Sequence, residues 1–205
     1  MKLPGNTLTV ADETKATYTF KAVSKTGVES YVSPEYSVWF EKIEMKQILP
    51  KTDGSTTIEV DRSQGTTYLV GLDTANTSVA ALKNELQNED VQIIVRRAGA
   101  VLTEADKVGT GCVVQCVSAK DTSVVYESAT VILYGDINGD GLIDQTDYNT
   151  MGIAAIADPT AIEGGVYSTA ADLNGDGVVD FFDVSLLNLH ISGKYPLNQT
   201  ARFYK

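Results

Sequence analysis

Two stretches of twelve residues near the end of this chain carry the same spacing of oxygen-bearing side chains. The first begins at Asp136, and the second begins 36 residues later, at Asp172. Each stretch has Asp or Asn at its positions 1, 3, 5, 9 and 12 and a glycine at position 6, which is Gly141 in the first and Gly177 in the second. A glycine permits the sharp turn that points the preceding side chains inward. The chain must therefore fold so that both stretches can close into tight loops.

This spacing matches a loop that surrounds one Ca²⁺ ion, which takes about 6–8 oxygen ligands at about 2.3–2.6 Å. Position 7 of such a loop contributes its backbone carbonyl, so its side chain is free to vary. We therefore expect two bound Ca²⁺, one in each loop. The predicted ligands are Asp136, Asn138, Asp140, Leu142, Asp144 and Asp147 in the first loop, and Asp172, Asn174, Asp176, Val178, Asp180 and Asp183 in the second.

Position 12 departs from the usual calcium loop. That position usually holds a glutamate that binds the ion through both oxygens, whereas here it holds Asp147 and Asp183. Aspartate is one methylene shorter, so the start of the following helix must lie closer to the metal. Whether these two carboxylates bind through one oxygen or both stays open. The alternative to metal binding is a pair of Asn/Asp/Gly turns on an acidic surface.

The composition limits the classes of function. The formal net charge is −11, and eight of the 27 acidic residues lie in the two loops. This acidity argues against nucleic acid as a partner, because phosphates would be repelled. The hydrophobic fraction of 43% is sufficient for ordinary cores. No apolar run approaches the roughly 18 residues that cross a membrane.

The two cysteines, Cys112 and Cys116, lie on one expected strand. Four residues along a strand span about 13 Å, which is too far for a disulfide. A zinc site needs further His or Cys ligands beside such a pair, so we expect two reduced, buried cysteines. The first residues do not form a signal peptide. The localisation of the protein must therefore be inferred from the family that the chain resembles.

The chain divides into three expected segments. In residues 1–42, alternating runs at 16–23 and 28–40 predict strands, which are either the last strands of a truncated β-sandwich or part of the next domain. Residues 43–134 read as a β-rich domain with strands near 56–60, 66–70, 91–95, 112–118 and 124–134. It has one helix, capped by Thr77 or Ser78. Its carboxylates are scattered, so we expect no glycosidase pair and no enzyme.

In residues 135–205, each calcium loop leads directly into a helix, predicted at residues 145–157 and 181–192. A strand, not a helix, precedes the first loop, so each unit is only half of the usual helix–loop–helix motif. Apolar stripes at helical spacing predict that the two helices pack together; these are Tyr148, Met151 and Ala155 on the first helix and Val184, Leu187 and Ile191 on the second. A further stripe contains Phe182, Leu186 and Leu189. It is either a binding surface or is covered by the β-rich domain or the tail.

Two loop–helix repeats of this kind resemble a dockerin, over residues 135–197. The resemblance rests on the opening sequence Gly135-Asp136-Ile137-Asn138-Gly139-Asp140-Gly141 and on Tyr148 and Met151, at core positions of the family's first helix. The β-rich domain before it resembles an X module. The implied fold is an α+β multidomain chain, with a β-rich, sandwich-like X-type module followed by an all-α dockerin.

The resemblance implies a non-catalytic, calcium-dependent docking module that binds a cohesin of a scaffold protein. Such a module anchors its parent protein in a cellulosome-like or cell-surface assembly, which places this bacterial chain outside the cell. A catalytic domain, such as a glycoside hydrolase for polysaccharide degradation, belongs elsewhere in the parent protein. The alternative is a calcium-stabilised structural domain of a secreted glycoside hydrolase that has no cohesin partner.

In the family, loop positions 10 and 11 and the exiting helices face the cohesin. The partner surface implied here consists of Gln145, Thr146, Asn149, Ile153, Phe181, Phe182, Ser185, Leu186 and Leu189. The usual Ser/Thr and Lys/Arg pairs are missing, which speaks against ordinary enzyme-borne type I pairing. The repeats also differ from each other, with Gln-Thr in one and Phe-Phe in the other. We therefore expect a 1:1 complex in a single orientation, led by the second helix.

Overall fold

The computed structural model describes residues 46–63, 65–87 and 89–200, together with the backbone of four strands between residues 14 and 40. The chain divides by its contacts into two units, Met1–Met45 and Lys46–Lys205. In the first unit, β1 (Thr14–Tyr18) pairs with β4 (Tyr36–Phe40), and β2 (Lys21–Val23) pairs with β3 (Glu29–Val32), both antiparallel. The remaining residues of the expected 1–42 segment lie outside the described ones, so its assignment to a β-sandwich stays a prediction.

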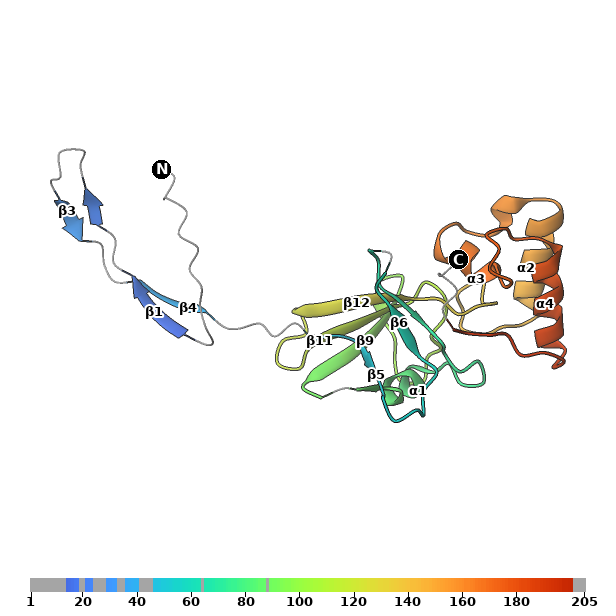
Figure 1. The fold of residues 1–205 in the computed structure, drawn as a ribbon, viewed down its shortest axis with the longest axis horizontal. Helices are drawn as coiled ribbons and strands as arrows, with labels where there is room; N and C mark the ends of the chain where they lie inside the picture. Colours follow the sequence, from blue (N-terminus) through green and yellow to red (C-terminus); the bar gives the residue numbers. More distant parts are fainter. Residues whose placement is uncertain are drawn as a thin grey trace. The chain divides into compact units, whose positions relative to one another are not determined.

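The β-rich part of the second unit, residues 46–133, is built on one six-stranded sheet (Figure 1). The strands, in spatial order, are β10 (Ala100–Val101), β9 (Val91–Arg97), β11 (Val113–Ser118), β12 (Val125–Val131), β7 (Tyr68–Val70) and β6 (Glu59–Asp61). All neighbours are antiparallel except β12 and β7, which are parallel. The sheet is therefore mixed, and it curls into a half-barrel.

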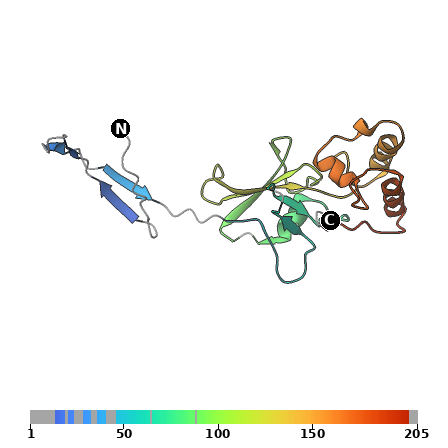
Figure 2. The same cartoon turned by 45° about the horizontal axis from the view of Figure 1, so that its top comes forward.

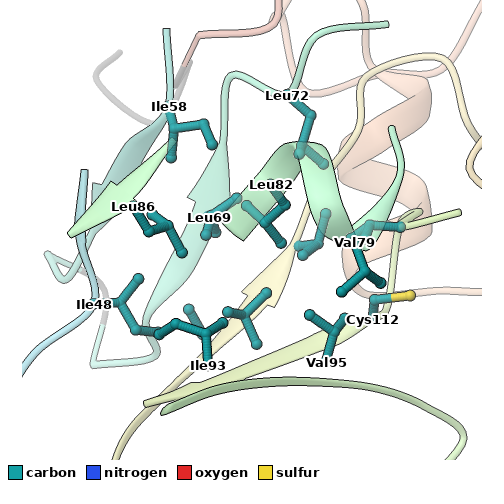
Figure 3. Packing of buried hydrophobic residues seen from close by; sticks show 14 of the residues in the cluster. Ile48, Ile58, Leu69, Leu72, Val79, Leu82, Leu86, Ile93, Val95 and Cys112 are labelled. Carbon is teal, nitrogen blue, oxygen red and sulfur yellow. The ribbon is translucent and has the colours of Figure 1, made fainter. Parts of the chain in front are cut away.

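A short helix and a two-stranded ribbon complete the core of this sheet. Helix α1 (Val79–Asn84) begins at Ser78, whose side chain accepts a hydrogen bond from the Ala81 N–H, and β5 (Leu49–Pro50) pairs with β8 (Leu86–Gln87). Figure 3 shows Val79 and Leu82 of the helix among Leu69 and Val95 of the sheet, and all four are fully buried. Full burial of one such side chain is worth about 1.5–3 kcal/mol.

The expected sandwich-like module is therefore wrong. A sandwich has two facing sheets, whereas this core lies between one curled sheet and a cover of α1 and the β5–β8 ribbon. Alternating residues reveal that a strand has one buried face, but they do not reveal what covers that face. The parallel pairing of β7 with β12, whose partner residues lie 62 positions apart in the chain, has no local signal either.

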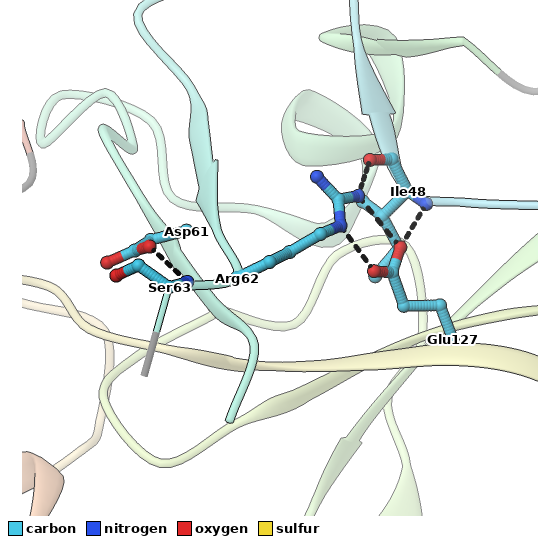
Figure 4. Close-up of polar contacts among 5 residues, drawn as sticks. All are labelled: Ile48, Asp61, Arg62, Ser63 and Glu127. Carbon is cyan, nitrogen blue, oxygen red and sulfur yellow. Dashed lines mark hydrogen bonds and ion pairs between the residues drawn. The ribbon is translucent and has the colours of Figure 1, made fainter. Parts of the chain in front are cut away.

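Arg62 and Glu127 fix the start of the second unit on the sheet (Figure 4). The Arg62 guanidinium donates to Glu127 through Nε at 2.6 Å and through Nη2 at 2.9 Å. The same Nη2 donates to the Ile48 carbonyl, and the Ile48 N–H donates to Glu127 Oε2 at 2.6 Å. Ile48 is fully buried, so these contacts tie the first buried residue of this unit to strand β12.

The helical part, residues 134–200, contains α2 (Gln145–Ile156), the 3₁₀ helix η1 (Pro159–Ala161), α3 (Val166–Ala171) and α4 (Phe181–Ile191). Helices α2 and α4 lie side by side in both views (Figure 1, Figure 2). Both were predicted to within one residue of their observed ends. Helix α3 was not, because its six residues show too little periodicity.

The helical part shares its core with the β-rich part, which corrects the expected all-α domain. Met151 of α2 and Leu187 of α4 are fully buried, as predicted, and they belong to a cluster that also contains Val70 of β7 and Ile132, which follows β12. A domain this small cannot bury a large core by itself. Its helices therefore pack on apolar residues of the preceding sheet, within one compact unit.

Candidate calcium loops and partner surface

Both loops start their helices with the same pair of carboxylates. The Asp144 side chain accepts a hydrogen bond from the Thr146 N–H at 2.7 Å, and the Asp147 side chain accepts one from the Asp144 N–H at 3.0 Å. Asp180 and Asp183 make the equivalent contacts at the start of α4. Each is a reciprocal capping box. Loop positions 9 and 12 therefore fix the first turn of each helix.

The position 12 carboxylates also reach back across their loops. Asp147 Oδ1 accepts from the Ile137 N–H at 2.8 Å, and Asp183 Oδ1 accepts from the Leu173 N–H at 2.7 Å. Both aspartates are fully buried, so each one joins the start of its loop to the start of its helix. Each Oδ1 also accepts a second N–H, from Asn138 at 3.3 Å in the first loop and from Asn174 at 3.0 Å in the second. Each Oδ2 accepts one N–H, from Asp144 or Asp180, so its second lone pair could bind a cation. The aspartate side chain, although shorter than glutamate, is long enough to join the start of the loop to the start of the helix.

The side chains at position 1 close the glycine turns. Asp136 accepts from the N–H groups of Gly139 at 2.8 Å and Gly141 at 3.1 Å. In the second loop, Asp172 accepts from those of Gly175 at 2.8 Å and Gly177 at 2.9 Å. The oxygens at positions 3 and 5 accept further N–H groups of their own loops, in the same pattern in both; these residues are Asn138, Asp140, Asn174 and Asp176. The two loops therefore have one architecture.

The donor set fits Ca²⁺. It consists of carboxylate, amide and carbonyl oxygens, which suit a hard cation and do not suit zinc. Burial raises the pKa of Asp136 to about 7, and burial also raises the pKa values of Asp147 and Asp183. A divalent cation would offset the cost of keeping these buried groups charged. Within the described residues, no three His, Cys, Asp or Glu side chains form a group that could hold a metal.

The first loop accepts hydrogen bonds from the β-rich part that have no counterpart among the described hydrogen bonds of the second loop. The Thr110 N–H donates to Asp136 Oδ2 at 2.9 Å, and the Thr77 hydroxyl donates to the Gly141 carbonyl at 2.7 Å. Arg97 Nη2 donates to the Asp140 carbonyl at 3.2 Å. None of these three donors was among the predicted site residues. They lie between 26 and 64 residues from their partners, and no local pattern connects residues at that separation.

Residues 134–192 match the family model of the dockerin type I domain. This part of the chain is a dockerin domain. No curated protein and no solved structure shows significant similarity to the chain. Dockerin domains are non-catalytic docking modules that generally bind calcium and pair with cohesins, and they are typically extracellular or associated with the cell surface. In the described ranges, no helix is both long and apolar enough to cross a membrane.

The dockerin helices expose several of the predicted partner residues. Phe181 is 67% exposed and Phe182 is 71% exposed, so neither side chain is covered by the β-rich part or by the described tail. Gln145, Thr146, Asn149, Ile153 and Leu189 are also exposed. Ser185 and Leu186 are half-buried, and Leu186 packs against the shared core. The surface also includes Ile156, at 76% exposure, which was not among the predicted partner residues.

His190 supports the end of the dockerin. The structure makes it half-buried, and its Nδ1 accepts a hydrogen bond from the Leu197 N–H at 3.2 Å. Burial lowers the pKa of the imidazole. The acceptor role requires an unprotonated Nδ1, so desolvation and this hydrogen bond together favour the neutral form.

Proposed function

We propose that this chain docks its parent protein to a cohesin module of a scaffold protein, in a cellulosome-like or cell-surface assembly outside a bacterial cell. The observation that carries the proposal is the exposed apolar surface on the dockerin helices, next to loops that fix the start of both helices. Phe181 and Phe182 are large aromatic side chains left in solvent on a small domain. Exposed aromatic groups of this kind are the anchors that protein interfaces favour.

We propose that two Ca²⁺ ions support this docking, one in each loop. The six oxygen donors predicted in each loop would hold the ion, and a bound ion supplies the positive charge that the buried carboxylates need. The loop residues themselves set the helix starts, because Asp144 and Asp180 are the N-caps of α2 and α4. Metal binding of this kind is coupled to folding. Loss of the ion would therefore loosen the helices that carry the partner surface.

The proposed complex is 1:1 and has one orientation. The first turn of α4 offers Phe181 and Phe182, whereas the first turn of α2 offers Gln145 and Thr146, so the two repeats present unlike surfaces. A partner that fits one helix start would not fit the other. The α4 surface leads the contact because it is the more apolar. An apolar interface depends weakly on salt, since screening acts on charges.

We further propose that the β-rich part is an X-type module that stiffens the dockerin, with boundaries near residues 42 and 134. The shared core supports this role, because Val70 and Ile132 pack with Met151 and Leu187. The same packing also favours the second candidate function, a calcium-stabilised structural domain of a secreted glycoside hydrolase without a cohesin partner. That candidate predicts a calcium-dependent melting temperature but no complex with any cohesin.

The experiment compares cohesin binding by the wild-type chain, Phe182→Ala and Val101→Ala. Val101 is a matched control, because it is an apolar residue of 57% exposure on β10, in the β-rich part. We expect Phe182→Ala to weaken binding about 10-fold or more, as truncation of an aromatic anchor does, and Val101→Ala to leave it unchanged. Calorimetric titration measures both. Equal affinities for the two variants would rule out the α4 surface as the docking site.

A further inference from the structure

The first calcium loop sits on a short segment of the β-rich part, residues 107–111. The Thr110 N–H donates to Asp136 Oδ2 at 2.9 Å, which places a hydrogen bond from outside the loop on its first predicted ligand. Asp136 is fully buried. In the second loop, Asp172 is half-buried, and the hydrogen bonds it accepts within the described residues come from Gly175, Asp176 and Gly177 of the same loop.

Two further contacts hold the backbone of the first loop. The buried Thr77 donates its hydroxyl to the Gly141 carbonyl at 2.7 Å, and Arg97 Nη2 donates to the Asp140 carbonyl at 3.2 Å. The same Arg97 nitrogen donates to the Lys107 carbonyl at 2.8 Å, so it joins the loop to the segment beneath it. These bonds restrain the turn at Asp140 and Gly141, loop positions 5 and 6. This turn directs the side-chain oxygens of the loop inward, toward the expected metal position.

The segment and the loop approach each other too closely for side chains. A Cβ atom at Gly109 would clash with Asp136 Oδ2 and would lie 2.5 Å from the Gly141 nitrogen. From the other side, a Cβ at Gly139 would lie 2.7 Å from the Thr110 carbonyl oxygen. At Gly177 of the second loop, by contrast, a Cβ would meet nothing within 4 Å. The first loop is therefore packed against the segment at its glycine turn, whereas the second loop has open space at the equivalent Gly177.

We propose that residues 107–111, together with Thr77 and Arg97, are a positioning element for the first calcium loop. They hold the Asp136 carboxylate and the turn at residues 140–141 in place before the metal arrives. Less ordering is then needed on binding, so the first loop binds Ca²⁺ more tightly than the second. A Ca²⁺ ion in the first loop also stabilises the β-rich part. The calcium affinity of the second loop, by contrast, depends on the residues of that loop alone. This inference rests on the proposed calcium binding.

The main test is Gly109→Ala, with Gly164→Ala as its control because a Cβ at Gly164 would meet nothing within 4 Å. Calcium titration of the whole chain by calorimetry gives the binding steps, and Asp136→Asn and Asp172→Asn assign them to the loops. We expect Gly109→Ala to weaken the first-loop step about 10-fold or more, a change of about 1.4 kcal/mol, and to leave the second-loop step unchanged. Gly164→Ala should alter neither step. An equal effect of Gly109→Ala on both steps, or on neither, would overturn the inference.

A gentler pair of variants tests the same point if Gly109→Ala folds poorly. Thr77→Val removes the hydroxyl that reaches Gly141 and nearly keeps the side-chain shape, and Thr77→Ser restores the hydroxyl. We expect Val to weaken the first-loop step several-fold and Ser to recover it. The Gly141 and Gly177 amide signals in nuclear magnetic resonance follow the two loops separately. A purely structural role for Thr77 would lower the melting temperature without moving the first-loop step, and that result would contradict the inference.

The wild-type chain separates this inference from the function on which it depends. If neither loop of the wild type binds Ca²⁺, calcium-dependent docking itself is wrong. If both loops bind Ca²⁺ with equal affinity, only the positioning role is wrong. The same holds if the Gly109 and Thr77 variants leave both calcium-binding steps unchanged. Arg97 remains unaltered in all of these variants because its positive charge opposes metal binding, whereas its hydrogen bonds favour the loop geometry.

Discussion

Gln199 makes a reciprocal pair of hydrogen bonds with the backbone of Tyr134. The Tyr134 N–H donates to Gln199 Oε1 at 2.8 Å, and Gln199 Nε2 donates to the Tyr134 carbonyl at 2.8 Å. Tyr134, the first residue of the dockerin, is thus bound by the C-terminal tail through two hydrogen bonds, as it would be by a neighbouring strand. Tyr134 and Leu197 are both buried in the shared core, whereas Tyr195 is 58% exposed. The two ends of the dockerin are therefore linked by Gln199 and Leu197.

Gln199→Ala should lower the melting temperature by several degrees. The substitution leaves a part-buried backbone N–H and carbonyl without these partners, at a cost of about 1–3 kcal/mol. For a chain of this size, 1 kcal/mol corresponds to about 2–4 °C. Differential scanning calorimetry measures the change, and Gln92→Ala, at an exposed position of β9, is the control. Equal melting temperatures for the two variants would show that the tail does not support the dockerin.

The Arg62–Glu127 pair should stabilise the chain more than the exposed Lys83–Glu104 pair. Glu127 is only 12% exposed and binds both Arg62 and the Ile48 N–H, whereas Glu104 is 62% exposed. We expect Glu127→Ala to cost about 1–3 kcal/mol and Glu104→Ala to cost about 0–1 kcal/mol. Urea unfolding gives both values. Equal costs would mean that the Arg62 contacts add nothing beyond those of a surface ion pair.

Chelation of calcium should loosen α2 and α4 more than it loosens the sheet. Both helices begin at loop carboxylates, whereas the strands of the half-barrel contain none of the predicted ligands. At a free calcium concentration about 100 times the Kd of one site, removal of the ion costs about 2.7 kcal/mol. Hydrogen exchange with EDTA should therefore accelerate at the amides of both helices. Unchanged exchange in α2 and α4 would show that the helices do not need the metal.

His190 should make stability depend on pH. Its pKa is lowered in the folded chain by burial, so the unfolded chain binds the proton more readily. Its stabilising contribution is therefore complete above the unfolded pKa of about 6.5 and is lost as the pH falls toward the lower folded pKa. His190→Asn keeps an acceptor for the Leu197 N–H but cannot titrate. The difference in unfolding free energy between wild type and variant should change between about pH 7 and pH 5 in favour of the variant; a constant difference would contradict this account.

The loops and their helices could be predicted because their signals are local. Asp144 and Asp180 stand directly before α2 and α4, and both are predicted calcium ligands and observed helix caps. Those signals therefore agree with each other. The dockerin match to residues 134–192 confirms the resemblance that the loop sequences indicated. It is a match to the type I model, although the contact residues differ from the usual ones; the expectation of unusual pairing stays a prediction.

The parts that could not be predicted depend on contacts between distant residues. Val70 belongs to a strand of the sheet but packs into the dockerin core, and Thr110 reaches Asp136 from outside the loop. The alternating pattern of a strand identifies a buried face and gives no information on which element covers it. The predicted sandwich failed for this reason, because α1 and the β5–β8 ribbon take the place that a second large sheet would occupy.

The most direct test of calcium-dependent docking is a calorimetric titration of this chain with a panel of cohesins, in calcium and again in EDTA. Calcium-dependent docking predicts that at least one cohesin binds with a stoichiometry of one in calcium and that the binding heat disappears in EDTA. Binding of equal strength in EDTA, or the absence of any complex across the panel while both loops hold calcium, would contradict it.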